Sequence, residues 1–237
     1  MKYEKIIQGN FISRPNRFIA EVEVAGVRTK AHVKNTGRLG ELLLPGARVY
    51  LEDFEGNMRG RKMRYSLIGV LKNVRDGVMQ LNIDSQAPNK VVKEALAEGR
   101  IKLPGLAELA FVKPEASYGE SRLDFYVKDC DGKEGYIEVK GVTLETDGIA
   151  SFPDAPTERG IKHLNKLKGL AAEGKKCYVI FVLQMRPMKC FVPNDERHKA
   201  FGDALRSAYE AGVNILAYQC KVAEDLLEIE KEVEVKL

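Results

Sequence analysis

The chain has 237 residues, of which 44% are hydrophobic and 30% charged, a composition that excludes wholesale disorder, collagen and coiled coil. Its longest wholly apolar runs, such as residues 179–183, fall far short of the ~20 residues that a membrane helix needs. The first eleven residues lack the apolar core of a signal peptide. We therefore expect a cytoplasmic protein with no membrane partner.

The cysteines, the histidines and the absence of some motifs narrow the chemistry. No pair of the four cysteines has the C-x-x-C spacing of a zinc site or a redox centre, and Cys177 and Cys220 lie in apolar runs typical of core positions. The motifs H-E-x-x-H, G-x-S-x-G and G-x-x-x-x-G-K-[ST] do not occur. The sequence therefore does not support a zincin, an α/β-hydrolase or a P-loop enzyme.

Positive charge is concentrated at the N-terminal end. Residues 1–86 hold 15 Lys and Arg against 9 Asp and Glu, whereas residues 87–237 hold 23 against 25. A basic surface attracts phosphate backbones in a sequence-tolerant and salt-sensitive way, although a solvated face with no partner is the alternative. The basic residues that we expect to contact DNA in this part are Arg14, Arg17, Lys34, Arg38, Arg59, Arg61, Lys62 and Arg64.

The first 86 residues read as a series of short strands separated by glycine-containing turns. We predict strands over 17–25, 27–33, 48–54, 63–71 and 78–83, with a hairpin at the Asp-Gly turn of residues 76–77. Five short strands in ~85 residues indicate a small β-barrel, and an oligonucleotide-binding (OB) fold is one candidate. A barrel that only supports the next domain is the other.

After residue 86 helices alternate with strands. We predict helices over 90–98, 157–172 and 195–211, and strands over 107–113, 122–128, 135–140, 177–184 and 213–219. The acidic tail could be a short helix or an edge element of the sheet. This order predicts a mixed α/β sheet with helices on its faces, and therefore two domains, residues 1–86 and 87–237.

The candidate catalytic residues are Asp124, Glu138 and Lys140, which fall on two consecutive predicted strands. Residues i and i+2 of a strand share a face, so Glu138 and Lys140 point the same way, and an antiparallel pairing brings Asp124 beside Glu138. Two carboxylates suit a hard cation such as Mg²⁺ or Mn²⁺, and a lysine can orient water or offset phosphate charge. An exposed, salt-bridged strand face is the alternative.

Further residues could complete this site. Glu115, Glu120 and Glu94 are candidates for a third metal ligand, and we take Glu115 forward. Arg159 and Lys162 lie near the start of the helix that follows the third strand, with Thr157 as the expected N-cap and His163 one turn after Arg159. Arg159 and Lys162 could hold phosphates, or they could simply form the solvated face of an amphipathic helix.

Two resemblances follow from these residues. The D…E-x-K pattern, within a succession of helix, three strands, helix and strand, resembles the PD-(D/E)XK nuclease superfamily. The strings NTGRLGELLLPGA, SRLDF, YIEVKGVTL, FPDAPTERGIKHL and GVNILAYQC together resemble the sugar fermentation stimulation protein A family over about residues 10–222. The resemblance implies an OB-like barrel followed by a PD-(D/E)XK-type domain. It also implies DNA binding without strong sequence preference and a role in regulating sugar (maltose) metabolism genes.

Two functions therefore remain open. The chain is either a DNA-binding regulator whose carboxylate site is vestigial or only binds metal, or a metal-dependent DNA nuclease that uses Asp124, Glu138 and Lys140. Clustered acids would repel DNA unless a cation neutralised them, which favours the enzyme. A helix-turn-helix within 198–220 is not supported, because an apolar strand-like run follows Gly212. A homodimer is compatible with DNA binding, but no segment argues for it specifically.

Overall fold

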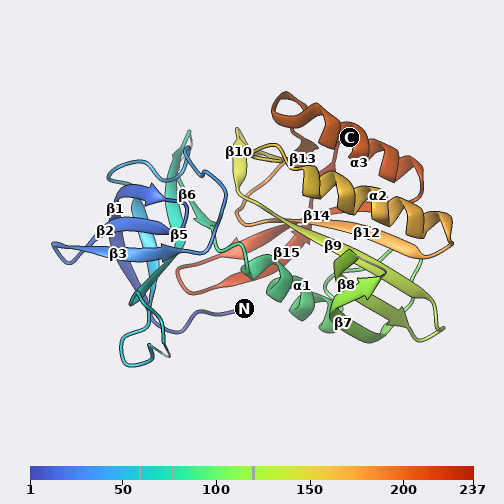
Figure 1. Cartoon of the computed structure of the whole chain (residues 1–237), viewed down its shortest axis with the longest axis horizontal. Helices are drawn as coiled ribbons and strands as arrows, with labels where there is room; N and C mark the ends of the chain where they lie inside the picture. Colours follow the sequence, from blue (N-terminus) through green and yellow to red (C-terminus); the bar gives the residue numbers. More distant parts are fainter. Residues whose placement is uncertain (59, 76, 119–120) are drawn as a thin grey trace. The chain divides into compact units, whose positions relative to one another are not determined.

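The computed structural model describes residues 1–58, 60–75, 77–118 and 121–237, which form two compact units (Figure 1). The first unit contains residues 1–87 with two later segments, 184–186 and 220–228. The second unit contains residues 88–183, 187–219 and 229–237. The change at residues 87 and 88 lies next to the expected domain boundary, whereas the two returning segments had no counterpart in the sequence-based division.

The first unit is built on β-strands. Its described strands pair as β1–β2, β2–β3, β3–β5, β5–β4 and β4–β1, and β6 also pairs with β5. Each of β1 to β4 therefore has two neighbours, and β5 has three. The β3–β5 pairing is parallel and the others are antiparallel. The bounds are β1 Ile6–Asn16, β2 Ile19–Val24, β3 Val27–Val33, β4 Arg48–Asp53, β5 Tyr65–Val74 and β6 Gly77–Asn82.

Alternation of side chains explains why β2 and β3 were predictable. Ala20, Val22, Ala31 and Val33 point inward and are at most 1% exposed, while the intervening positions carry charged or polar groups. Strand β1 was not predicted, because its glycine and proline and its polar residues break the alternation. Gly9 is required there, since a Cβ would lie 2.7 Å from the carbonyl oxygen of Glu23 on β2.

The second unit is organised around a mixed sheet in the order β15-β14-β12-β9-β8-β7. Strand β12 runs parallel to both β9 and β14, whereas β8 runs antiparallel to β9 and β7. The bounds are β7 Leu109–Tyr118, β8 Ser121–Asp129, β9 Glu134–Val142, β12 Lys176–Leu183, β14 Asn214–Val222 and β15 Leu227–Glu232. The tail therefore adds an edge strand, which is one of the two predicted alternatives.

Helices cover both faces of this sheet, as the sequence predicted. Helices α2 (Glu158–Ala172) and α3 (Asp195–Glu210) lie together on one side, and α1 (Ala87–Ala97) lies on the other (Figure 1). Phe201 of α3 contacts Phe152, which in turn packs on Phe181 of β12 with ring centroids 5.7 Å apart. Cys177 and Cys220 are fully buried, which confirms that they are core residues.

A small second sheet was not predicted. Its strands are short and have the order β10-β11-β13-β16, with β10 Leu144–Thr146, β11 Ile149–Phe152, β13 Cys190–Pro193 and β16 Glu234–Val235. Segments of two to four residues carry too little periodicity to be recognised from sequence. Across the described residues, no helix combines the length and the apolar character needed to cross a bilayer.

Candidate functional site

The three predicted catalytic residues meet on one face of the second unit's sheet. Asp124 lies on β8, and Glu138 and Lys140 lie on β9. The two strands pair Tyr126 with Tyr136 and Phe125 with Ile137, so the next pair in this register is Asp124 with Glu138. Opposite residues of an antiparallel pair share a face. An Asp124 oxygen also accepts the backbone N–H of Val139 at 2.8 Å, which fixes the aspartate in place.

The Glu138 carboxylate is buried and only half satisfied. The residue is 2% exposed, and its Oε1 binds the Lys140 ammonium at 2.6 Å as well as Nδ1 of His163. Its Oε2 is buried and has no hydrogen-bond partner among the described atoms. Because a buried polar atom without a partner costs free energy, this oxygen is an unused acceptor next to a second carboxylate.

The two carboxylates are held in different states. Burial raises the pKa of Asp124, and the negative charge of Glu138 raises it further, against the hydrogen bonds from Val139 and Asn89. Burial also acts to raise the pKa of Glu138, but the hydrogen bond from His163 and the charge of Lys140 outweigh it and hold that pKa below its ordinary value. Glu138 is therefore held as the charged carboxylate, whereas Asp124 beside it gains a proton more readily than an ordinary aspartate.

Helix α2 delivers a histidine to this pair. Thr157 is the N-cap, as predicted, and its hydroxyl oxygen accepts the N–H of Gly160 at 3.1 Å. One turn further, the Arg159 Nε–H donates to Nε2 of His163 at 3.4 Å. The Nε2 atom is then the acceptor, so the ring proton sits on Nδ1 and is donated to Glu138. Arg159, His163 and Glu138 form one chain of contacts.

His163 and Asn89 are the members of the site that sequence reasoning missed. The Asn89 side chain, in the first turn of α1, donates to Oδ1 of Asp124 at 2.8 Å. The spacing of Arg159 and His163 was a usable signal, because it places both on one helix face. Nothing in the sequence distinguishes Asn89 from an ordinary first-turn residue.

The predicted third ligand, Glu115, lies opposite Asp124 in the register of β7 and β8, but its carboxylate is engaged elsewhere. Glu115 is exposed, and its carboxylate binds Arg122 on the neighbouring strand. Glu94 lies on α1, and Glu120 is outside the described residues. Within the part of the chain that the structure describes, no group of three His, Cys, Asp or Glu side chains could hold a metal. A cation at this site would therefore depend on Asp124 and Glu138, with backbone or water oxygens for the rest.

Three of the basic residues predicted to contact DNA are engaged within the first unit. Arg14 donates to four backbone carbonyls at 2.7 to 2.8 Å. Lys34 is 12% exposed and binds the carboxylates of Glu52 and Asp84. Arg64 binds both oxygens of Asp53, at 2.7 and 2.9 Å. These three side chains are already engaged in contacts that stabilise the unit.

The remaining basic residues present more of their charge to solvent. In the first unit, Arg17, Arg38 and Lys62 are exposed. Arg61 is half-buried instead, because its guanidinium donates to the Ser66 hydroxyl and lies 3.7 Å from the ring centroid of Phe54. Arg59 is outside the described residues. In the second unit, Arg159 and Lys162 are exposed on the first turns of α2, on the helix that also carries His163.

Comparison with known proteins gives consistent matches over both units. The profile described as "SfsA N-terminal OB domain" matches residues 12–79, and that described as "Sugar fermentation stimulation protein RE domain" matches residues 86–226. Sugar fermentation stimulation protein homologs of Ruminiclostridium cellulolyticum and Clostridium beijerinckii are 50% and 51% identical over 237 residues, which is 100% of each chain.

One solved structure is similar over the whole chain. It is that of Pyrococcus furiosus SfsA in complex with Ca²⁺, which is 28% identical with a TM-score of 0.86. The similarity covers 100% of this chain and 98% of that one. The two-part architecture is therefore shared with a protein whose structure contains a divalent cation.

Proposed function

Because the chain belongs to the sugar fermentation stimulation protein family, we propose that it binds DNA with little sequence preference and holds a divalent cation at Asp124 and Glu138. The family's role in regulating sugar (maltose) metabolism genes is the biological context of this proposal. The observation that carries it is the buried Oε2 of Glu138, which has no partner among the described atoms and lies beside a second carboxylate.

The donor set fits a hard cation. Asp124 and Glu138 supply carboxylate oxygens, which Mg²⁺, Mn²⁺ and Ca²⁺ all accept. A cation would satisfy the unpaired oxygen and offset the repulsion from Glu138, which adds to the effect of burial in raising the pKa of Asp124. The Ca²⁺ bound to the archaeal relative supports a divalent ion, and we propose Mg²⁺ or Mn²⁺ for this chain. When bound, such an ion would stabilise negative charge on a phosphate.

The proposed DNA contacts use the exposed basic residues rather than the engaged ones. An OB domain commonly binds single strands or oligonucleotides along one face and its loops. In the first unit the candidate contacts are Arg17, Arg38 and Lys62, and in the second they are Arg159 and Lys162. Phosphate contacts of this kind give affinity without sequence preference, and they weaken steeply with salt.

Cation binding is tested by thermal unfolding and calorimetry with Mg²⁺, Mn²⁺ or Ca²⁺. A ligand at 100 times its Kd stabilises the folded state by about 2.7 kcal/mol, so the melting temperature should rise with cation concentration. Asp124→Asn and Glu138→Gln should abolish the rise. Asp131→Asn should keep it, because that aspartate is exposed on the loop between β8 and β9. An unchanged rise in Glu138→Gln would refute the site.

DNA binding is tested by fluorescence anisotropy on several unrelated sequences. The affinities should agree within a few-fold and should fall steeply with added salt. One sequence bound about 100-fold more tightly than the others would refute non-specific binding.

In the cation-binding experiment, Glu115→Gln serves as a further comparison, since loss of cation binding in that variant would restore Glu115 as a ligand.

A second candidate function is metal-dependent hydrolysis of DNA, in which water attacks phosphorus and one P–O bond of the backbone breaks. It is favoured by the ammonium of Lys140, which sits at the carboxylate pair where phosphate charge could be offset. Arg159 and Lys162 would hold phosphates, and His163 would keep Glu138 in place. Cleavage in Mg²⁺ or Mn²⁺ that disappears with EDTA and in Glu138→Gln would establish the enzyme. Tight binding without cleavage of single- or double-stranded DNA would refute the nuclease and favour the DNA-binding regulator.

A further inference from the structure

A groove of about 500 Å³ runs beside the β1–β2 hairpin of the first unit. We call it the hairpin groove. Three arginines, Arg14, Arg17 and Arg38, line it, and Phe11, Leu43 and Pro45 give it apolar surface. Its lining contains no aspartate and no glutamate. A concave surface with this charge favours an anion that also has an apolar part.

Arg14 holds the groove together, and none of its partners among the described residues is an acid. Its guanidinium donates to the carbonyls of Arg17 on the hairpin and of Asn35, Gly37 and Arg38 on the loop after β3. Its Nε is buried and has no partner among the described atoms. Carbonyl dipoles solvate a cation but do not cancel its charge, so a phosphate near the groove would be attracted.

An exposed ring lies beside Arg17, one of the two exposed arginines of the groove. Phe18 at the hairpin tip is 50% exposed, and the Arg17 guanidinium lies 5.6 Å from its ring centroid. The Asn16 side chain accepts the backbone N–H groups of Phe18 and Ile19, which orders the tip. An exposed aromatic ring next to arginine is the usual platform on which an unpaired base stacks.

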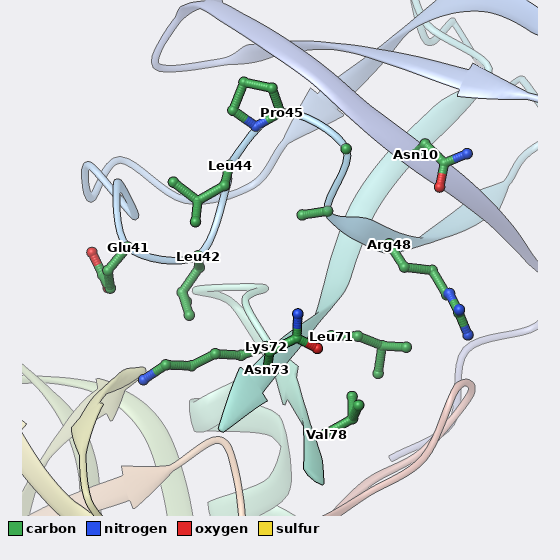
Figure 2. A pocket seen from close by; sticks show the side chains of 12 residues that line it. Asn10, Glu41, Leu42, Leu44, Pro45, Arg48, Leu71, Lys72, Asn73 and Val78 are labelled. Carbon is green, nitrogen blue, oxygen red and sulfur yellow. The ribbon is translucent and has the colours of Figure 1, made fainter. Parts of the chain in front are cut away.

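A neighbouring pocket shows that this combination is not a general property of the unit. Figure 2 shows that pocket, of about 670 Å³, with Leu44 and Pro45 on one wall and Leu71 on another. Its polar lining mixes Glu41 with Arg48 and Lys72. Opposite charges in one pocket offset each other, so it has no comparable preference for a phosphate.

We propose that the hairpin groove binds single-stranded DNA, with phosphates on Arg17 and Arg38 and an unpaired base against Phe18 and the apolar lining. This inference rests on the proposed DNA binding and deepens it by naming the form of DNA. Bases in a duplex are stacked on each other, and only an unpaired base offers its face to Phe18. The preference for single strands therefore depends on the ring, and the salt dependence on the arginines.

The experiment compares a twelve-residue thymidine oligonucleotide with a twelve-pair duplex by fluorescence anisotropy over a range of salt. Phe18→Ala should weaken binding of the single strand about 10-fold and leave the duplex nearly unchanged. Phe18→Tyr should restore it. Arg38→Ala should lower the slope of log K against log salt by about 0.7 for the single strand.

Two matched control variants change exposed residues that do not line the groove, one at the β2–β3 turn and one on β3. Val27→Ala removes an apolar side chain that is 65% exposed at the β2–β3 turn, and Lys30→Ala removes an exposed charge from β3. Val27→Ala should leave single-strand affinity unchanged, and Lys30→Ala should leave the preference for single strands unchanged. Thymidine monophosphate at about 5 mM should not displace the strand, because one nucleotide forms too few contacts.

The outcomes separate this inference from the proposed function. If the protein binds both DNAs and the Phe18 and Arg38 variants change neither, the groove is not the site, although DNA binding stands. Equal losses on strand and duplex, losses in Val27→Ala as large as those in Phe18→Ala, or displacement by the mononucleotide would also overturn it. If the wild-type protein binds no DNA, the proposed function fails and the inference fails with it.

Discussion

Lys140→Met removes the ammonium that is bonded directly to the buried Glu138 carboxylate. The Lys140 Nζ lies 2.6 Å from Glu138 Oε1, and the two side chains are 15% and 3% exposed. Removing one partner of a buried ion pair leaves the other charge uncompensated and costs about 3–5 kcal/mol. His163 still binds the same oxygen, so we expect the lower end, about 3 kcal/mol. Methionine keeps most of the packing of the lysine stem.

The loss is measured in EDTA, with hydrogen exchange of the β9 amides as the main readout. Hydrogen exchange reports the stability of the second unit separately. The melting temperature is followed by circular dichroism, because the chain has no tryptophan to give a fluorescence signal. A loss of about 3 kcal/mol corresponds to a melting temperature lower by roughly 6–12 °C for a chain of this size. Added Mg²⁺ should recover part of the loss, since a cation at Asp124 and Glu138 would replace the missing charge.

The control is Lys133→Met on the loop between β8 and β9. Lys133 is 55% exposed, and its Nζ lies 3.9 Å from Asp131, so its removal should change stability by about 0.5 kcal/mol or less. Lys140→Arg keeps the charge and should lose less than Lys140→Met. A Lys140→Met protein as stable as Lys133→Met would refute the view that the buried Glu138 carboxylate depends on the Lys140 ammonium.

Three further predictions concern the scaffold. Gly135→Ala should destabilise by about 1–3 kcal/mol in urea unfolding, because its Cβ would lie 3.0 to 3.2 Å from three side chains, whereas Gly169→Ala has open space and should be stabilising; equal effects would contradict the packing. Thr157→Ala should cost about 1 kcal/mol and Thr157→Ser much less, and a neutral alanine would show that the cap is not formed. The Arg64 guanidinium holds the pKa of Asp53 well below its ordinary value, so this carboxylate stabilises the fold above its unfolded pKa of about 3.9 and the contribution is lost as pH falls below it; Asp53→Asn should flatten the decline of stability between about pH 5 and 2, and an unchanged acid limb in thermal melts would refute the assignment.

The parts of the fold that were predictable from sequence depend on local patterns. Strand β3 and helix α2 were predicted within one residue of their observed bounds, because strict alternation and a capped amphipathic run specify them locally. The site pair was predictable for the same reason. A hairpin fixes its own register, so the spacing of Asp124 and Glu138 already implies that they lie side by side.

The parts that were missed depend on contacts between distant segments. Gln184 follows β12, yet its side chain donates to Asn82 and to the carbonyl of Asp84, about a hundred residues earlier. No periodicity within a segment records such a partner. The same limit explains the engaged arginines: Arg14 is as basic in sequence as Arg38, and only the fold determines that one binds four carbonyls while the other faces solvent.

The missing members of the site follow from the electrostatics of the carboxylate pair itself. Two carboxylates side by side repel, so the fold must either supply positive groups or leave one acid protonated. Glu138 receives both an ammonium and the N–H of an imidazole, whereas the donors to Asp124 among the described residues are neutral, namely Asn89 and the Val139 backbone. The positive charge therefore lies on one side of the pair, and the free oxygen of Glu138 remains unsatisfied. A divalent ion between the two acids would complete this arrangement by binding the free oxygen of Glu138. Glu138→Gln, rather than Asp124→Asn, should therefore decide between a metal site and a structural ion pair.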